Sequence, residues 1–96
     1  MEIEWDEEKR LSNLAKHGID FADAEELFSG PVLSGKDDRK DYGEDRFIGY
    51  GFIRDRLVVV AFARRGEVVR IISLRKANSR EGKRYEEAIK NRLEPS

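Results

Sequence analysis

Three apolar segments separated by very short polar turns constrain the fold more than any other feature of this sequence. They span residues 46–53, 57–64 and 68–74, and Arg54-Asp55-Arg56 and Arg65-Gly66-Glu67 connect them. Strands joined by connections this short pair in the antiparallel sense. The middle segment is apolar at both alternating sets of positions, which is typical of a central strand covered on both faces. The sequence therefore predicts an antiparallel meander.

A helix is predicted before this meander, from Asp6, its N-cap, to about His17. Gly18 follows and suits the left-handed position at a helix end. The helix has three apolar residues on one face, which we expect to face the core: Leu11, Leu14 and Ala15. The opposite face is expected to be solvated and cationic, and it holds Lys9, Asn13, Lys16 and His17.

A second, shorter helix is expected to complete a helical hairpin. Asp20 would be its cap, with Asp23 in a capping-box position, and Gly30-Pro31 would end it. Short extended segments are expected at Ile3–Trp5 and, as an edge strand, at Pro31–Ser34.

A third helix is expected after the meander, because Asn78 and Glu81 match a capping box. Gly49 and Gly51 share one face of their strand, which predicts a bulge or the close approach of another backbone. The predicted fold is an α+β sandwich in one domain over residues 1–96. It has two N-terminal helices, three or four antiparallel strands and a C-terminal helix.

The composition excludes several classes of function. The chain has one histidine and no cysteine, and it lacks a Gly-rich phosphate loop, so no metal and no cofactor are expected. The carboxylates of residues 35–45 lack the spacing of a calcium loop. The start is acidic, and no apolar run approaches the roughly 20 residues that span a bilayer. We therefore expect a cytoplasmic protein that does not bind membranes.

The formal charge of −1 conceals a strong asymmetry along the chain. Residues 1–45 hold 14 acidic and 6 basic side chains, whereas residues 46–96 hold 6 acidic and 13 basic ones. The halves therefore carry −8 and +7. A basic half of this kind suggests a polyanion or an acidic partner, and mutual neutralisation within one fold is the alternative.

The cations that flank the predicted sheet are the strongest candidates for a site. Arg64, Arg70, Arg75 and Lys76 come from adjacent strands, and Arg80 lies in the first turn of the last helix. Arginine suits bidentate contact with phosphate. Arg70 and Arg75 have opposite strand parity, so they share one face only if a bulge separates them.

These residues suit RNA cleavage without a metal ion. Arginines bind an RNA phosphate and stabilise the charge that develops when a 2′-hydroxyl attacks it, a role we assign to Arg70 and Arg75. An imidazole ordinarily titrates near neutral pH, so His17 is the proton-transfer candidate, with a role in complementing the helix dipole as the alternative. Lys16, Arg64, Lys76 and Arg80 would follow the RNA backbone. Tyr42, in the polar loop, is a candidate for base stacking.

Two sets of residues, one in each half of the chain, resemble the pattern of the BrnT family. The first comprises Trp5-Asp6, Lys9, Asn13, Lys16-His17-Gly18, Phe21, Ala24 and Phe28. The second comprises Asp38-Arg39, Gly43-Glu44-Asp45-Arg46, Arg70-Ile71-Ile72-Ser73-Leu74-Arg75-Lys76-Ala77, Glu81 and Tyr85. The resemblance implies a RelE-like fold and a ribonuclease toxin of a type II toxin–antitoxin module. It also implies a BrnA-like ribbon-helix-helix antitoxin as partner, contact with DNA only through that antitoxin, and a dimer or a heterotetramer with it.

Two other functions remain compatible with the same residues. The chain could act only as a non-catalytic partner and corepressor of a DNA-binding antitoxin, with the basic strand docking an acidic segment. It could also be a structural domain whose arginines pair with its own N-terminal carboxylates.

Overall fold

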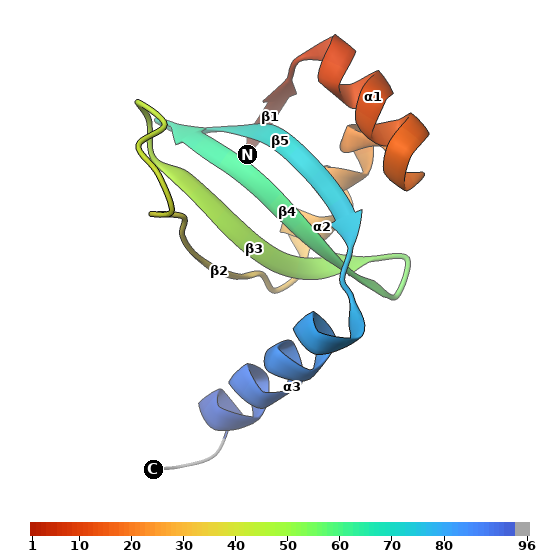
Figure 1. Cartoon of the computed structure of the whole chain (residues 1–96), viewed down its shortest axis with the longest axis vertical. Coiled ribbons are helices and arrows are strands. Elements are labelled where there is room, and N and C mark those ends of the chain that lie inside the picture. Colours follow the sequence, from red (N-terminus) through yellow and green to blue (C-terminus); the bar gives the residue numbers. More distant parts are fainter. Residues whose placement is uncertain (94–96) are drawn as a thin grey trace.

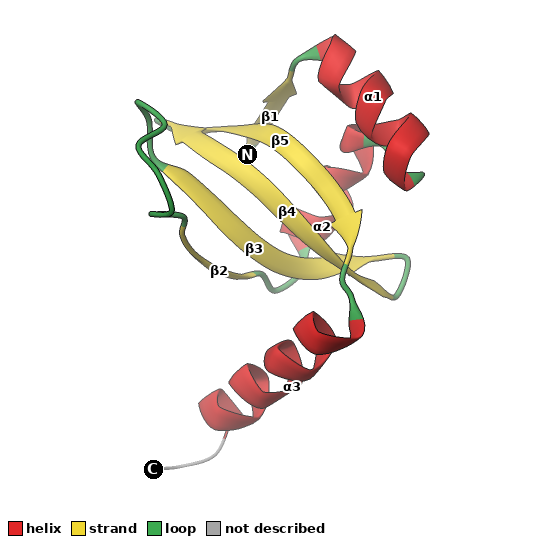
Figure 2. Cartoon of the chain, in the orientation of Figure 1, coloured by secondary structure: helices red, strands yellow, loops and turns green. Residues whose placement is uncertain are grey.

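The computed structural model describes residues 1–93 and contains a five-stranded mixed sheet with helices beside it (Figure 1, Figure 2). The strands are β1 (Glu2–Trp5), β2 (Leu33–Lys36), β3 (Arg46–Ile53), β4 (Arg56–Arg65) and β5 (Val68–Lys76). The helices are α1 (Glu7–His17), the 3-10 turn η1 (Phe21–Asp23), α2 (Ala24–Ser29) and α3 (Ser79–Leu93). Within residues 1–93, no helix is long and apolar enough to cross a membrane.

The predicted meander is confirmed, but the sheet is larger than expected and is not purely antiparallel. The strand order is β1-β5-β4-β3-β2, so β4 is central and β2 forms an edge, both as predicted. β1 pairs in parallel with β5, which corrects the expectation of three or four antiparallel strands. The two strands are far apart in the sequence, and the long connection allows parallel pairing that a tight turn forbids.

The predicted helix boundaries are largely confirmed. Asp6 caps α1 by accepting a hydrogen bond from the Lys9 amide, and Gly18 ends it with φ +71°. The Asn78–Glu81 capping box before α3 is present in both directions. The capping box predicted for Asp20 and Asp23 is wrong, because the Asp20 carboxylate accepts from the Ala22 amide and opens the 3-10 turn η1 instead.

One face of the sheet carries the core, and the opposite face is largely open. The core joins η1 and α2 to β3, β4 and β5, through buried side chains such as Phe21, Leu27, Val60, Ile71 and Leu74. α3 leaves the end of β5 and projects away from the sheet (Figure 1). Its Tyr85 ring contacts Tyr50 and Phe52 on the open face. The predicted sandwich is therefore wrong, since α3 does not cover the second face.

The orientation of α1 is opposite to the predicted one. Leu11 and Leu14 are 52% and 37% exposed, whereas Asn13 is only 8% exposed. The Asn13 side chain donates to the carbonyls of Leu74 (2.9 Å) and Ile19 (3.1 Å), and accepts from the Leu74 amide (3.2 Å). β1 pairs with β5 only as far as Ile71, so the edge of β5 beyond that point needs another partner. Asn13 supplies it and thereby turns the polar face of α1 inward.

The predicted bulge or backbone approach at the glycines of β3 is wrong, because the register of β3 with β2 and β4 is regular and the atoms that come near belong to side chains. A Cβ atom at Gly51 would lie 2.8 Å from Cγ of the fully buried Leu27. We expect Gly51→Ala to lower the free energy of unfolding by about 1–3 kcal/mol, because Leu27 must move in a packed core. Urea denaturation measures this loss. The control Gly35→Ala, where no atom lies within 4 Å, should change stability little, and equal losses for both variants would contradict the packing argument.

Candidate functional site

A β-bulge in β5 places the two arginines of the predicted site on one face. The register with β4 shifts between Ala61, which pairs with Ser73, and Phe62, which pairs with Ile71, so Ile72 is the extra residue. Arg70 pairs with Ala63 and Arg75 with Val59. Residues 59 and 63 have the same parity in β4, and paired residues point to the same side of a sheet. Arg70 and Arg75 therefore both lie on the open face, as the sequence required of a shared site.

The residues that lie between these arginines on the open face have small side chains. Ser73 lies beside Ala61, and Ala63 separates Arg70 from Arg46 on the next strand. Small side chains, those of Ser73 and Ala61, therefore lie between Arg70 and Arg75 on this face.

Each of the two arginines holds a carboxylate. Arg75 makes a bidentate pair with Glu81, with both nitrogen–oxygen distances 2.7 Å, and Arg70 Nη1 lies 3.0 Å from Glu4 Oε2. The Glu81 carboxylate raises the pKa of Arg75, and the Arg75 guanidinium lowers the pKa of Glu81 to about 2. An incoming phosphate must therefore compete with Glu4 and Glu81 for these cations.

We expect the Arg75–Glu81 pair to give the chain a measurable pH dependence of stability. The pKa of Glu81 lies below its ordinary value of 4.5, so the pair stabilises the fold fully above that pH and loses its contribution as pH falls toward 2. Glu81→Gln keeps the helix cap, which glutamine can also form, but removes the charge. The difference in Tm between the parent and this variant should be largest above about pH 5 and vanish near pH 2. A gap that is constant from pH 7 to pH 2 would contradict this assignment.

His17 lies beside the bulge rather than over the open face. A shallow cleft of about 210 Å³ separates the end of α1 from β5, and its lining includes Lys9, Lys16, His17, Ile72 and Ser73. His17 is half-buried and Lys16 is exposed. The structure therefore brings two predicted residues, Lys16 and His17, together at the edge of β5 next to Ser73.

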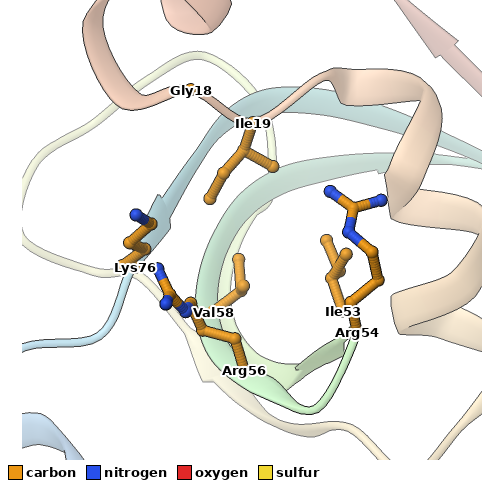
Figure 3. A pocket seen from close by; sticks show the side chains of 7 residues that line it. All are labelled: Gly18, Ile19, Ile53, Arg54, Arg56, Val58 and Lys76. Atoms are coloured by element: carbon orange, nitrogen blue, oxygen red, sulfur yellow. The ribbon is translucent and has the colours of Figure 1, made fainter.

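The other predicted RNA contacts are dispersed. Lys76 lies on the helix-bearing face, where it lines a hollow with Arg54 and Arg56 (Figure 3). Arg64 is on the same face but at the opposite end of the strands, beside Phe47 and Phe62. Arg80 is exposed at the start of α3. The structure does not gather Arg64, Lys76 and Arg80 into one surface with Arg70 and Arg75.

The charge asymmetry is partly neutralised inside the fold, as the alternative explanation predicted. Arg70 pairs with Glu4, Arg54 with Asp23, and Arg65 with Glu44, which joins the basic half to the acidic half. Several cations of the basic half nevertheless have no carboxylate partner within residues 1–93: Arg56, Arg64, Lys76 and Arg80. Internal pairing therefore accounts for part of the basic half and leaves free cations for an external anion.

The polar loop before β3 is organised by Asp37. Its carboxylate accepts from the Arg39 guanidinium (2.8 and 2.9 Å) and from the Tyr42 hydroxyl (3.0 Å), and the Arg39 hydrogen bonds hold the Asp37 pKa well below its usual range. The Arg46 guanidinium lies 4.3 Å from the centre of the Tyr42 ring. That cation covers Tyr42, so a base could stack there only on ring surface that Arg46 leaves free.

Two residues of this site occur in the family-like pattern, but the sequence assigned neither of them a role. Ser73 lies between the arginines and beside His17, and Arg46 lies across Ala63 from Arg70. The parity conflict between Arg70 and Arg75 was the available signal for Ser73, since the bulge it required falls at Ile72. Arg46 could have been found only from the register between β3 and β4.

Comparison with known proteins gives one family. The family model described as the ribonuclease toxin BrnT of a type II toxin–antitoxin system matches residues 5–81, which include α1, the whole sheet apart from most of β1, and the start of α3. No curated protein matches the chain.

Proposed function

The chain belongs to the BrnT family of ribonuclease toxins of type II toxin–antitoxin systems, and we propose that it is a cytoplasmic, metal-independent endoribonuclease that cleaves RNA and thereby inhibits translation and growth. The observation that carries this proposal is the bulge at Ile72. It is the reason that Arg70 and Arg75 share a face, and Ser73, which lies between them, lines the same shallow cleft as His17.

In this proposal, the scissile phosphate sits over Ser73. Arg70 and Arg75 exchange Glu4 and Glu81 for phosphate oxygens and hold the extra negative charge that forms when the 2′-hydroxyl attacks phosphorus. The attacking oxygen loses its proton, the P–O5′ bond breaks, and the leaving oxygen gains a proton. His17, at the neighbouring edge, moves one of these protons.

The RNA backbone is proposed to continue along cations around this point. Lys16 adjoins His17 in the edge cleft, and Lys76 follows Arg75 at the end of β5. Arg64 and Arg80 lie farther away and are proposed to contact more distant phosphates.

A BrnA-like ribbon-helix-helix antitoxin is the proposed partner, in a heterotetramer or with a dimer of this chain, and any contact with DNA is through that antitoxin. Five strands, one of them parallel, depart from the RelE-like arrangement expected from the sequence, so a relationship to RelE ribonucleases stays a prediction. The alternative function is a non-catalytic corepressor, in which an acidic segment of the antitoxin would take the place of Glu4 and Glu81 on Arg70 and Arg75.

RNA cleavage by the purified chain tests the proposal. We expect cleavage in the presence of excess chelator, with products that end in a 2′,3′-cyclic phosphate or 3′-phosphate because the nucleophile is the 2′-hydroxyl. Activity that requires a divalent cation would contradict the mechanism. A chain that binds its antitoxin tightly, leaves RNA intact and does not affect growth would support the corepressor instead.

A further inference from the structure

A cationic hollow lies at the end of the sheet, on the face opposite to the proposed reaction site. It has a volume of about 280 Å³ and lies between Gly18-Ile19 at the end of α1, the turn between β3 and β4, and the last residue of β5. Figure 3 shows Arg56 and Lys76 on one side of the hollow and Arg54 on the other, with apolar side chains between them.

The turn between β3 and β4 fixes the position of Arg56. Ile53 pairs with Arg56, so the loop has only two residues, and both lie in the left-handed region (Arg54 φ +47°, Asp55 φ +62°). This conformation matches the twist of a tight hairpin, although it is uncommon without glycine or asparagine. Glu26 of α2 also accepts a hydrogen bond from the Arg54 amide at 2.6 Å. The turn is thereby tied to α2, and Arg56 points to the same side as Ile53.

The cations of the hollow are not equally occupied. Arg54 lies 3.3 Å from Asp23, whereas Arg56 and Lys76 have no carboxylate partner within residues 1–93. Two uncompensated cations from adjacent strands therefore face one small space. Such a space favours an anion with several oxygens.

The floor of the hollow argues against a peptide as the ligand. Its apolar side chains are almost completely covered, since Ile19, Ile53 and Val58 are 5%, 4% and 1% exposed. An acidic protein segment would find cations there but little apolar surface for its side chains. A phosphate needs only the cations and space.

The hollow lies on the opposite face from the proposed reaction site but is built from the same two chain segments. Lys76 directly follows Arg75, and Gly18 directly follows His17, so the same two chain segments contribute to both places. We propose that this hollow binds a backbone phosphate of the RNA beside the cleaved bond, with Arg56 and Lys76 as its ligands. The inference rests on the proposed function. It adds a second phosphate contact, because the RNA would pass from the open face around the end of β5 to the opposite face.

Binding of an RNA oligonucleotide that is 2′-O-methylated at every position tests this subsite, because such RNA binds without being cleaved. Each lost phosphate contact on a single strand should reduce the slope of log K against log salt by about 0.7, which corresponds to roughly fivefold weaker binding at 0.1 M salt. Arg56→Gln should show one such loss and Arg56→Gln with Lys76→Gln about two. Arg92→Gln, in the last turn of α3, is the matched control and should leave the slope unchanged. Thermal melting verifies that each variant is folded.

The outcomes separate the subsite from the function as a whole. Unchanged slopes in the Arg56 and Lys76 variants, with a parent chain that still binds and cleaves RNA, would overturn the subsite and leave the proposed function intact. Variants that keep RNA affinity but lose affinity for poly-glutamate would assign the hollow to an acidic protein segment and also overturn it. A parent chain that neither binds nor cleaves RNA would contradict both proposals.

Discussion

Asn13→Ala is expected to destabilise this protein by about 3 kcal/mol, because the alanine leaves the Leu74 amide and carbonyl without the partners that Asn13 provides. In a chain of this size, such a loss corresponds to a fall in Tm on the order of 15 °C. Alanine is the better helix former, so the whole loss reports the tertiary hydrogen bonds rather than α1 itself. Equilibrium unfolding in urea, with thermal melting as a second probe, measures it.

Leu11→Ala is the matched control, since Leu11 lies on the same helix but points outward. Truncation of a buried leucine costs about 2–5 kcal/mol, whereas a change at an exposed position is usually within about 0.5 kcal/mol. The structure therefore predicts a large loss for the polar residue and a small one for the apolar residue. The reverse order would show that α1 packs through Leu11, as the sequence pattern alone suggests.

The orientation of α1 could not be predicted from the sequence. The helix has only two leucines and an alanine to mark an apolar face, and both leucines are exposed. A single buried amide outweighed that weak pattern, because the backbone of β5 beyond Ile71 would otherwise lack partners on its outer edge. This need arises only after β1 pairs with β5, and a parallel pairing between distant segments leaves no local signal.

The meander and the caps were predictable because their causes are local. Two short turns decided the pairing of β3, β4 and β5, and Asp6, Gly18 and Asn78 occur where helix ends need them. Strand parity even identified the condition under which Arg70 and Arg75 share a face. The partners of those arginines were not predictable, because Glu4 reaches Arg70 only through the pairing of β1 with β5, and the contact of Glu81 with Arg75 depends on how α3 leaves the sheet.

Removal of Arg75 is expected to have the largest effect on activity. In the proposed mechanism, its guanidinium holds charge that exists only in the transition state, and loss of one such donor typically costs 10²–10³-fold in kcat, or about 3–4 kcal/mol. We therefore expect Arg75→Gln to lower the rate of RNA cleavage by about that factor and to abolish growth arrest. Single-turnover cleavage at saturating enzyme separates this loss from weaker RNA binding.

Arg75→Gln also leaves Glu81 without its partner, so a loss of activity could reflect a loss of structure. The double variant Arg75→Gln with Glu81→Gln removes the unpaired charge, and it should recover stability without recovering cleavage. Arg10→Gln is a second control, because Arg10 is also paired with carboxylates, Glu7 and Asp20, but lies outside the site. This variant should lose an ion pair and keep RNA cleavage. Cleavage that returns in the double variant would make Arg75 a structural residue, and the transition-state role would then fall to Arg70.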